Sequence, residues 1–229
     1  IDLSTLARTA FPGRGGVGLS VAIRPGGGLW AVTESSPDSG DSAGTHVTIY
    51  DGEGHAIPFA RGRGDNNVGS WLADGSGLVL STGRWSGDFY DLMAQSLSGS
   101  IRRLTSDPLQ DGGGFVSPDG TRIAFVRTGI PEGSAVCVQG LDSLPPAMCI
   151  TGAGPAFSSV GRADNNTLLT LKAQPDGLNR LEALDLASRG SRLLLENVHD
   201  VLPSPDARWL VFDQLVPGRP ALAWFVAPM

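Results

Sequence analysis

The amino-acid sequence predicts an all-β protein, specifically a β-propeller of five blades with four antiparallel strands each. Three observations predict this fold. The 229 residues include 32 glycines and 16 prolines at an ordinary apolar content, which is typical of many short strands joined by tight turns. No stretch carries apolar residues at helical spacing over ten or more positions. A hairpin signature recurs every 42 to 48 residues, close to the length of one propeller blade.

The signature is clearest where Ser, Pro, Asp and Gly occupy positions 117 to 120. Ser at the first position, Pro with its φ already set at the second, Asp at the third and Gly at the fourth are the residues that a type I turn prefers. Apolar runs on both sides of this turn, at 115–116 and 123–126, predict the two strands of an antiparallel hairpin.

The other elements follow from weaker copies of this hairpin. The second turn residue of each copy is Pro25, Ala73, Pro118, Ala163 or Pro205. These markers predict blades at 19–60, 68–105, 115–151, 157–195 and 200–226, within a single domain of residues 1–229. The third and fourth strands of the first three blades are joined at 51–54, 97–100 and 140–146, and a long polar insertion at 34–45 interrupts the first blade.

The fifth unit has only three predicted strands, while one further strand, at 3–11, has no hairpin partner beside it. Each irregularity explains the other if the amino-terminal strand completes the last blade. Such closure would join the first blade to the last and remove an exposed sheet edge. We therefore expect a closed ring.

The hairpin at 117–125 resembles the repeat of TolB-type propellers, also called the WD40-like or PD40 repeat, and the hairpin at 204–212 is similar to it. The first copy keeps Pro and Gly, while the second and fourth keep Asp74 and Asp164 without the Pro. The resemblance implies an extracytoplasmic binding or sensing module without chemistry of its own. Most such propellers have six blades, so a count of five departs from the family pattern.

Charge and hydropathy exclude two classes of partner. The net charge is −6 and Lys172 is the only lysine, so no basic stripe is available to neutralise phosphates, and we expect no nucleic-acid binding. No apolar run approaches the roughly 20 residues of a membrane span, and the sequence does not open on a signal segment. We expect a monomer that is periplasmic or extracellular, tethered or not by a segment outside this sequence, and part of a larger protein.

Cys137 and Cys149, the two cysteines, flank a predicted hairpin loop. Facing positions on adjacent strands can bring two cysteines to bonding distance. The sequence leaves open whether they form a disulfide or remain two buried thiols, and a disulfide would indicate an oxidising compartment.

Candidate binding residues lie in the loops that gather at one end of a propeller channel. The loops that enter the innermost strands supply Arg14, Asp65, Asp111, His199 and Asp200. Three converging aspartates could hold a cation or a basic side chain, so metal occupancy is left open. The alternative is that each aspartate caps a backbone turn.

Arg84 and Trp85, in the loop between the second and third strands of the second blade, are further contact candidates, because Trp and Arg dominate binding hot spots. The alternative for Trp85 is packing over the edge of its own blade. These residues predict a site for a protein partner or a small polar ligand at the loop end of the channel.

Two catalytic motifs occur out of context. The GxGxxG match at 13–18 precedes a strand rather than a helix, and the GxSxG match at 40–44 lies in a polar insertion. We therefore expect no cofactor and no catalytic residue. The sequence predicts a non-catalytic binding or sensing module. The alternative is a carbohydrate-active five-bladed propeller, either a glycoside hydrolase or a lectin, with Asp65, Asp111 and Asp200 as its acidic residues.

Overall fold

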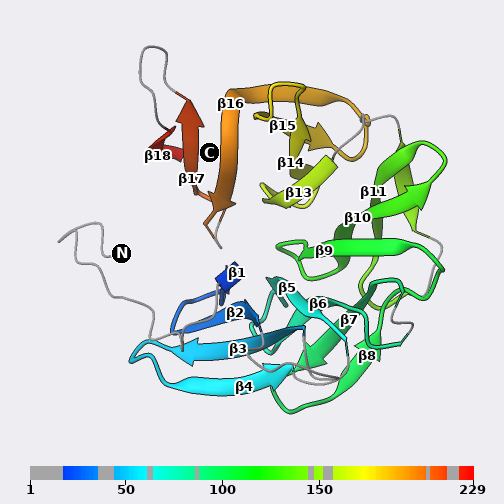
Figure 1. Ribbon diagram of the computed structural model, residues 1–229, viewed down its shortest axis with the longest axis vertical. Helices are drawn as coiled ribbons and strands as arrows, with labels where there is room; N and C mark the ends of the chain where they lie inside the picture. The colour runs from blue at the N-terminus through cyan, green and yellow to red at the C-terminus, as the bar shows by residue number, and fades with distance from the viewer. Residues whose placement is uncertain are drawn as a thin grey trace.

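The computed structural model describes residues 18–35, 44–60, 64–85, 88–143, 147–151, 157–204, 207–215 and 222–229. They form four antiparallel sheets arranged around a common centre, as in a β-propeller (Figure 1). The described residues contain no helix that is long and apolar enough to cross a membrane.

The first three sheets are four-stranded meanders, as predicted. The first comprises β1 (Gly18–Ile23), β2 (Leu29–Ser35), β3 (Thr45–Asp51) and β4 (Ala56–Ala60). The second comprises β5 (Asn66–Trp71), β6 (Gly77–Thr82), β7 (Asp91–Ser96) and β8 (Ile101–Arg103). The third comprises β9 (Gln110–Val116), β10 (Arg122–Ile130), β11 (Gly133–Gly140) and β12 (Met148–Thr151).

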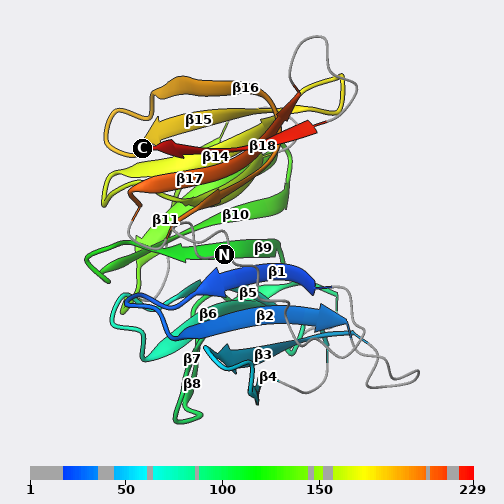
Figure 2. The same cartoon turned by 90° about the vertical axis from the view of Figure 1, so that its left-hand side faces the viewer.

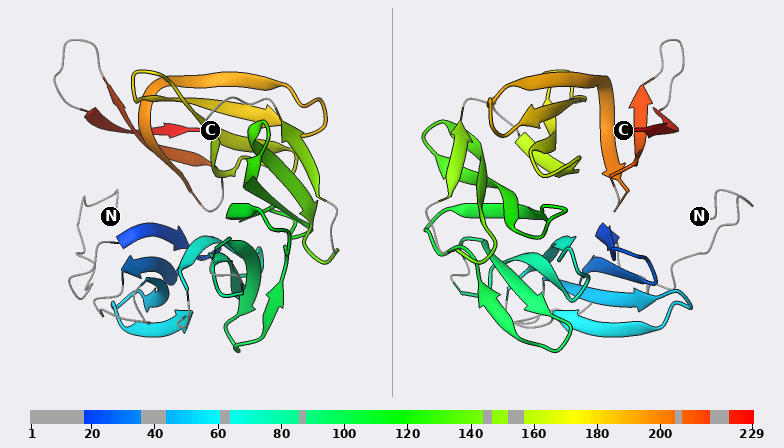
Figure 3. Two further views of the ribbon diagram at one scale, coloured as in Figure 1. Left: turned by 45° about the vertical axis from the view of Figure 1, so that its right-hand side comes forward. Right: turned by 180° about the vertical axis from the view of Figure 1, so that it is seen from behind.

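The fourth sheet has six strands, so the expected count of five separate sheets is wrong. It comprises β13 (Phe157–Arg162), β14 (Thr167–Ala173), β15 (Asn179–Asp185), β16 (Ser191–Pro203), β17 (Trp209–Leu215) and β18 (Leu222–Pro228). A single strand, β16, spans the predicted boundary between the fourth and fifth units, and it bends there (Figures 1 and 3). Asn197 lies in this stretch with a φ of 58°, a conformation that Asn tolerates better than most residues.

The four sheets follow one another in chain order around the centre (Figure 1), and the side view shows the first two sheets at the bottom and the fourth at the top (Figure 2). Buried clusters join each sheet to the next. One joins the first and second sheets through Ile49 and Leu80, another joins the second and third through Leu92 and Phe125, and another joins the third and fourth through Ala124 and Leu168. A fourth cluster packs β14 and β15 against β16 and β17 within the six-stranded sheet. The buried apolar residues therefore pack between neighbouring sheets and, in the fourth sheet, between its two halves.

The turn at residues 117–120 forms as its residues predict. The Ser117 carbonyl accepts a hydrogen bond from the Gly120 amide, and the Asp119 carboxylate accepts bonds from the Ser117 hydroxyl and from the amide and hydroxyl of Thr121. These bonds, led by that from Ser117, lower the pKa of Asp119 to about 2. Gly120 has a φ of 71°, a conformation that favours glycine, and Ala207 takes a similar φ of 54° in the last copy.

Each innermost strand carries one extra residue relative to its partner, a β-bulge. The register shifts between Gly18 and Ser20 in β1, and equivalent shifts occur in β5, β9 and β13. The pairing of β16 with β17 shifts in the same sense between Val198 and Val201. The bulge is therefore a repeated feature that the turn pattern did not predict.

The bulges of the second and third sheets touch near the centre. The Ser70 hydroxyl donates to the Gly114 carbonyl at 2.9 Å and accepts from the Val116 amide at 3.0 Å. A Cβ atom at Gly69 would lie 2.1 Å from the Gly113 carbonyl oxygen. Glycine is therefore required at position 69 for the close approach of two backbones.

Cys137 and Cys149 are opposite each other in the β11–β12 pair and form a disulfide, which settles the alternative that the sequence left open. The predicted strand at 3–11 lies outside the described residues, and so does the closure that it would provide. Among the described residues, the sheet that it would complete ends at β18.

We predict that Gly69→Ala lowers the free energy of unfolding by about 1–3 kcal/mol, because the new methyl group forces two backbones apart. Urea denaturation measures the change. Gly52→Ala is the matched control, since a Cβ atom at Gly52 meets nothing within 4 Å. Equal effects of the two substitutions would contradict the close packing at Gly69.

Candidate functional site

At the loop end of the channel, polar side chains join the first sheet to the second and the second to the third. Asp65, just before β5, accepts a hydrogen bond at 2.7 Å from the amide of Thr45, which begins β3 of the preceding sheet. Gln110 of β9 accepts from the Tyr90 amide at 3.0 Å and donates to the Asp88 carbonyl at 2.9 Å. The loops that enter the innermost strands therefore lie beside the loops between the second and third strands of the preceding sheet.

The second carboxylate oxygen of Asp65 accepts a short hydrogen bond from the Tyr90 hydroxyl. Burial, this hydrogen bond and the charge of Asp65 raise the pKa of Tyr90 to about 12. The phenol therefore stays protonated at neutral pH and acts as a donor. Both oxygens of Asp65 are engaged in holding two loops together.

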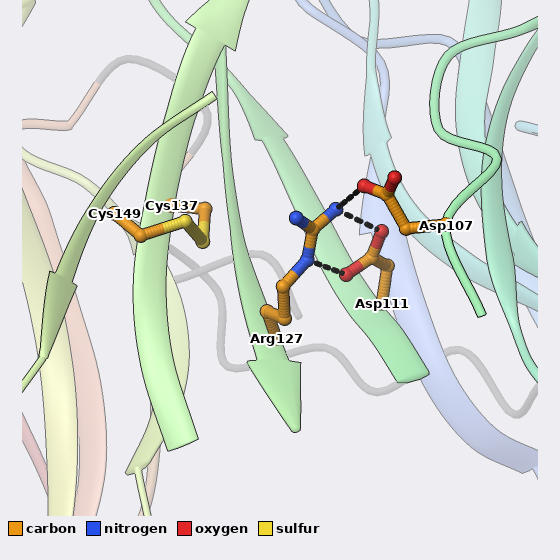
Figure 4. Close-up of a disulfide and its surroundings, with 5 residues drawn as sticks. All are labelled: Asp107, Asp111, Arg127, Cys137 and Cys149. Carbon is orange, nitrogen blue, oxygen red and sulfur yellow. Dashed lines mark hydrogen bonds and ion pairs between the residues drawn. A yellow bond between two sulfur atoms is a disulfide. The ribbon is translucent and has the colours of Figure 1, made fainter. Parts of the chain in front are cut away.

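Asp111 on β9 is fully buried and paired with Arg127 on β10 (Figure 4). The two guanidinium contacts measure 2.8 and 2.9 Å, one to each carboxylate oxygen. Asp107 binds the same guanidinium at 2.8 Å. Hydrogen bonding to Asp111, with the charges of both aspartates, raises the pKa of Arg127. This bidentate geometry is the strong form of an ion pair, and it uses both oxygens of Asp111.

Trp85 stacks over the guanidinium of Arg103, which lies 4.9 Å from the ring centroid. Arg103 is on β8, the outer strand of the same sheet, and donates to the buried carboxylate of Asp91 at 2.7 Å. Burial, opposed by Arg103, raises the pKa of Asp91. Trp85 remains 39 % exposed. It thus covers the edge of its own blade, as the alternative interpretation expected, and still offers a face to solvent.

His199 and Asp200 lie on β16 next to Asp213 of β17. The Asp200 amide donates to Asp213 at 2.5 Å, and the His199 ring nitrogen lies 3.4 Å from the same carboxylate. The Asp200 carboxylate accepts from the amide of the next residue, Val201, at 2.8 Å. Its contacts are local, as expected of a backbone cap.

A pocket of about 200 Å³ opens between the second and third sheets. Its lining is mostly polar and uncharged, with Asp111 as the charged member: Asn67, Ser81, Tyr90, Gln110, Asp111, Gly112, Val126 and Thr128. Tyr90 connects this lining to Asp65, so two of the three predicted aspartates flank one pocket.

The predicted three-aspartate cluster gains no support as a cation site. Within the described ranges, no group of three or more His, Cys, Asp or Glu side chains could hold a metal ion. Arg14 lies outside the described residues, and Arg84 donates its amide to the Thr82 hydroxyl while its side chain is exposed.

Several residues of this end were not singled out from the sequence, chiefly Tyr90, Asp107, Gln110 and Arg127. Arg127 is the cross-strand partner of Asp111, so the pairing register of the β9–β10 hairpin could have identified it. A regular hairpin places Thr128 opposite Asp111, and only the bulge at Gly114 brings Arg127 there. The pairing of Asp111 with Arg127 could therefore not be predicted from the sequence without knowing the position of the bulge.

Comparison of the sequence with known protein families and with curated proteins finds no match. The structure is similar to TolB from Acinetobacter baumannii, with a TM-score of 0.72, 15 % identity, and coverage of 88 % of this chain and 52 % of that one. It is similar to a protein assigned to TolB from Agrobacterium tumefaciens, with a TM-score of 0.61, 18 % identity, and coverage of 76 % and 62 %.

Prolyl oligopeptidase B from Galerina marginata has a TM-score of 0.54 and 10 % identity, and the match covers 85 % of this chain and 31 % of that one. The chain therefore has the fold of TolB-like propellers, as its repeats predicted, and it spans about half the length of the first of these structures.

We predict that Asp111→Asn lowers the free energy of unfolding by about 3 kcal/mol, because it breaks a buried ion pair around Arg127. Asp200→Asn is the matched control and should change stability by less than about 0.5 kcal/mol, as expected of an exposed cap. Chemical denaturation of both variants distinguishes the two roles. Equal stability of the two variants would contradict a structural role for Asp111.

Proposed function

We propose that the protein is a non-catalytic β-propeller module that binds a protein partner or a small polar ligand at the loop end of its channel. The observation that carries the proposal is the state of the loop-end aspartates. Asp65 is bonded through both oxygens, Asp111 is paired with Arg127, and Asp200 caps its own strand. The pocket beside them is left as a surface for recognition.

The same contacts argue against the hydrolase alternative. Glycoside hydrolysis needs one carboxyl group as acid and a second as base or nucleophile, on either side of the bond to be cleaved. A carboxylate that is buried and held by an arginine is poorly placed for either role. The lectin form of the alternative needs no free carboxylate and is compatible with the pocket.

An extracytoplasmic location is part of the proposal. The Cys137–Cys149 disulfide is favoured in oxidising compartments, and the similarity to TolB points the same way. Only about half the length of that TolB is matched, so its own activity is not transferred here.

We further propose a fifth blade, formed by the second half of β16 with β17 and β18, and completed by residues 3–11. Its inner pairing has the same bulge as the other four inner hairpins. Both ends of the array leave apolar side chains between 36 % and 49 % exposed, Val21 and Ile23 on β1 and Leu202, Val211 and Val226 on the last strands. Closure of the ring would cover them.

The binding proposal predicts that filling the pocket abolishes partner binding without unfolding the protein. Gly112 lines the pocket, and a Cβ atom there meets nothing within 4 Å, so Gly112→Trp places an indole in it. The measurement is affinity capture from an extracytoplasmic extract of the source cells. The wild-type protein should capture a specific protein or ligand. Gly52→Trp, in the β3–β4 turn and equally open, is the matched control.

The proposal expects Gly52→Trp to keep the captured species and Gly112→Trp to lose it. Capture that survives Gly112→Trp contradicts it. So does hydrolysis of a nitrophenyl glycoside by the wild type that Asp65→Asn abolishes.

A further inference from the structure

The pocket between the second and third sheets retains hydrogen-bonding groups that the fold does not use. Ser81 is 7 % exposed and lines the pocket, and its side-chain hydroxyl makes no hydrogen bond to the described residues. Thr128 lines the opposite side and likewise has no partner in that part of the chain. Asn67 accepts from Thr45 through its carbonyl oxygen and keeps its amide hydrogens. Neither hydroxyl is among the described side-chain atoms that are both buried and without a partner, so both are open to a ligand in the pocket.

The carboxylates that line or flank the pocket already accept hydrogen bonds within the protein. Both oxygens of Asp111 accept from Arg127, and both oxygens of Asp65 accept from the protein. A cation would find no free oxygen on Asp111, which lines the pocket, or on Asp65 beside it. An anion would be repelled, because Asp65, Asp107 and Asp111 outnumber Arg127 here. A neutral ligand is therefore favoured.

The free groups also indicate the chemistry of that ligand. Serine and threonine hydroxyls both donate and accept, and the Asn67 amide donates, so a ligand that carries hydroxyl groups can satisfy all three. Tyr90 and Val126 supply apolar contact surface in the same lining. A volume of about 200 Å³ is below that of pockets for drug-sized ligands. It suits one small ring rather than an extended chain.

We infer that this pocket binds a single neutral sugar ring, either free or at the end of a glycan. The inference rests on the proposed binding function and specifies its ligand class. Ser81 and Thr128 hold ring hydroxyls from the two sheets, and Asn67 donates to a third oxygen. The site joins β6 of one blade to β10 of the next, so the bound ring lies across a blade junction.

The test is a titration of the isotope-labelled protein with glucose, galactose, mannose and N-acetylglucosamine, followed by amide NMR shifts. At least one sugar should shift the amides of Ser81, Gly112 and Thr128 with a Kd near or below about 1 mM. Ser81→Ala and Thr128→Val should each weaken that binding by about two- to tenfold, the effect of losing one hydrogen bond. Ser143→Ala, on an exposed turn, is the control.

Gly112→Trp should abolish the shifts, and Gly52→Trp should retain them. The methyl glycoside of the responding sugar should bind as well if a glycan end is recognised, and more weakly if only the free sugar is. Absence of shifts with all four sugars overturns the inference, and so do shifts that survive Gly112→Trp. If no sugar binds but Gly112→Trp still abolishes capture of a protein partner, the sugar site is wrong and the proposed binding function is retained.

Discussion

The close approach of inner strands at the centre is the constraint on which the rest of this structure depends. Gly69 and Ser70 of one sheet contact the backbone of Gly113 and Gly114 of the next. The bulges that permit this contact add one residue to each inner strand. Because a one-residue shift exchanges the two faces of a strand, the bulge decides which side chains reach the loop end.

The site follows from that register. The shift in β9 places Arg127 opposite Asp111, and the pair removes the charge of a fully buried carboxylate from the pocket. Asp65 is used in the same way by Tyr90 and Thr45. The rest of the pocket lining is uncharged and mostly polar. The proposed binding surface lies where two blades meet. Of the aspartates beside it, Asp65 bonds Thr45 of the preceding sheet, while Asp111 pairs with Arg127 within its own sheet.

The sequence predicts the parts of this fold that depend on local chemistry. The turn at 117–120 forms because Ser, Pro, Asp and Gly each meet one requirement of it, and the strand positions follow from the apolar runs. The bulges depend on contacts between sheets, so the turn pattern cannot locate them, and the partner of Asp111 stayed hidden. The stretch at 196–199 has no Gly or Pro and continues as β16, which is why the expected break between two sheets is absent.

Amide hydrogen exchange of β18 tests most directly the central proposal, that residues 3–11 close the ring against this strand. If residues 3–11 pair with this edge strand, its outward amides exchange slowly in the whole chain and rapidly after deletion of residues 1–11. The deletion should also lower the melting temperature, because it exposes the apolar ends of the array. Identical exchange of β18 with and without residues 1–11 would contradict closure by the amino-terminal strand.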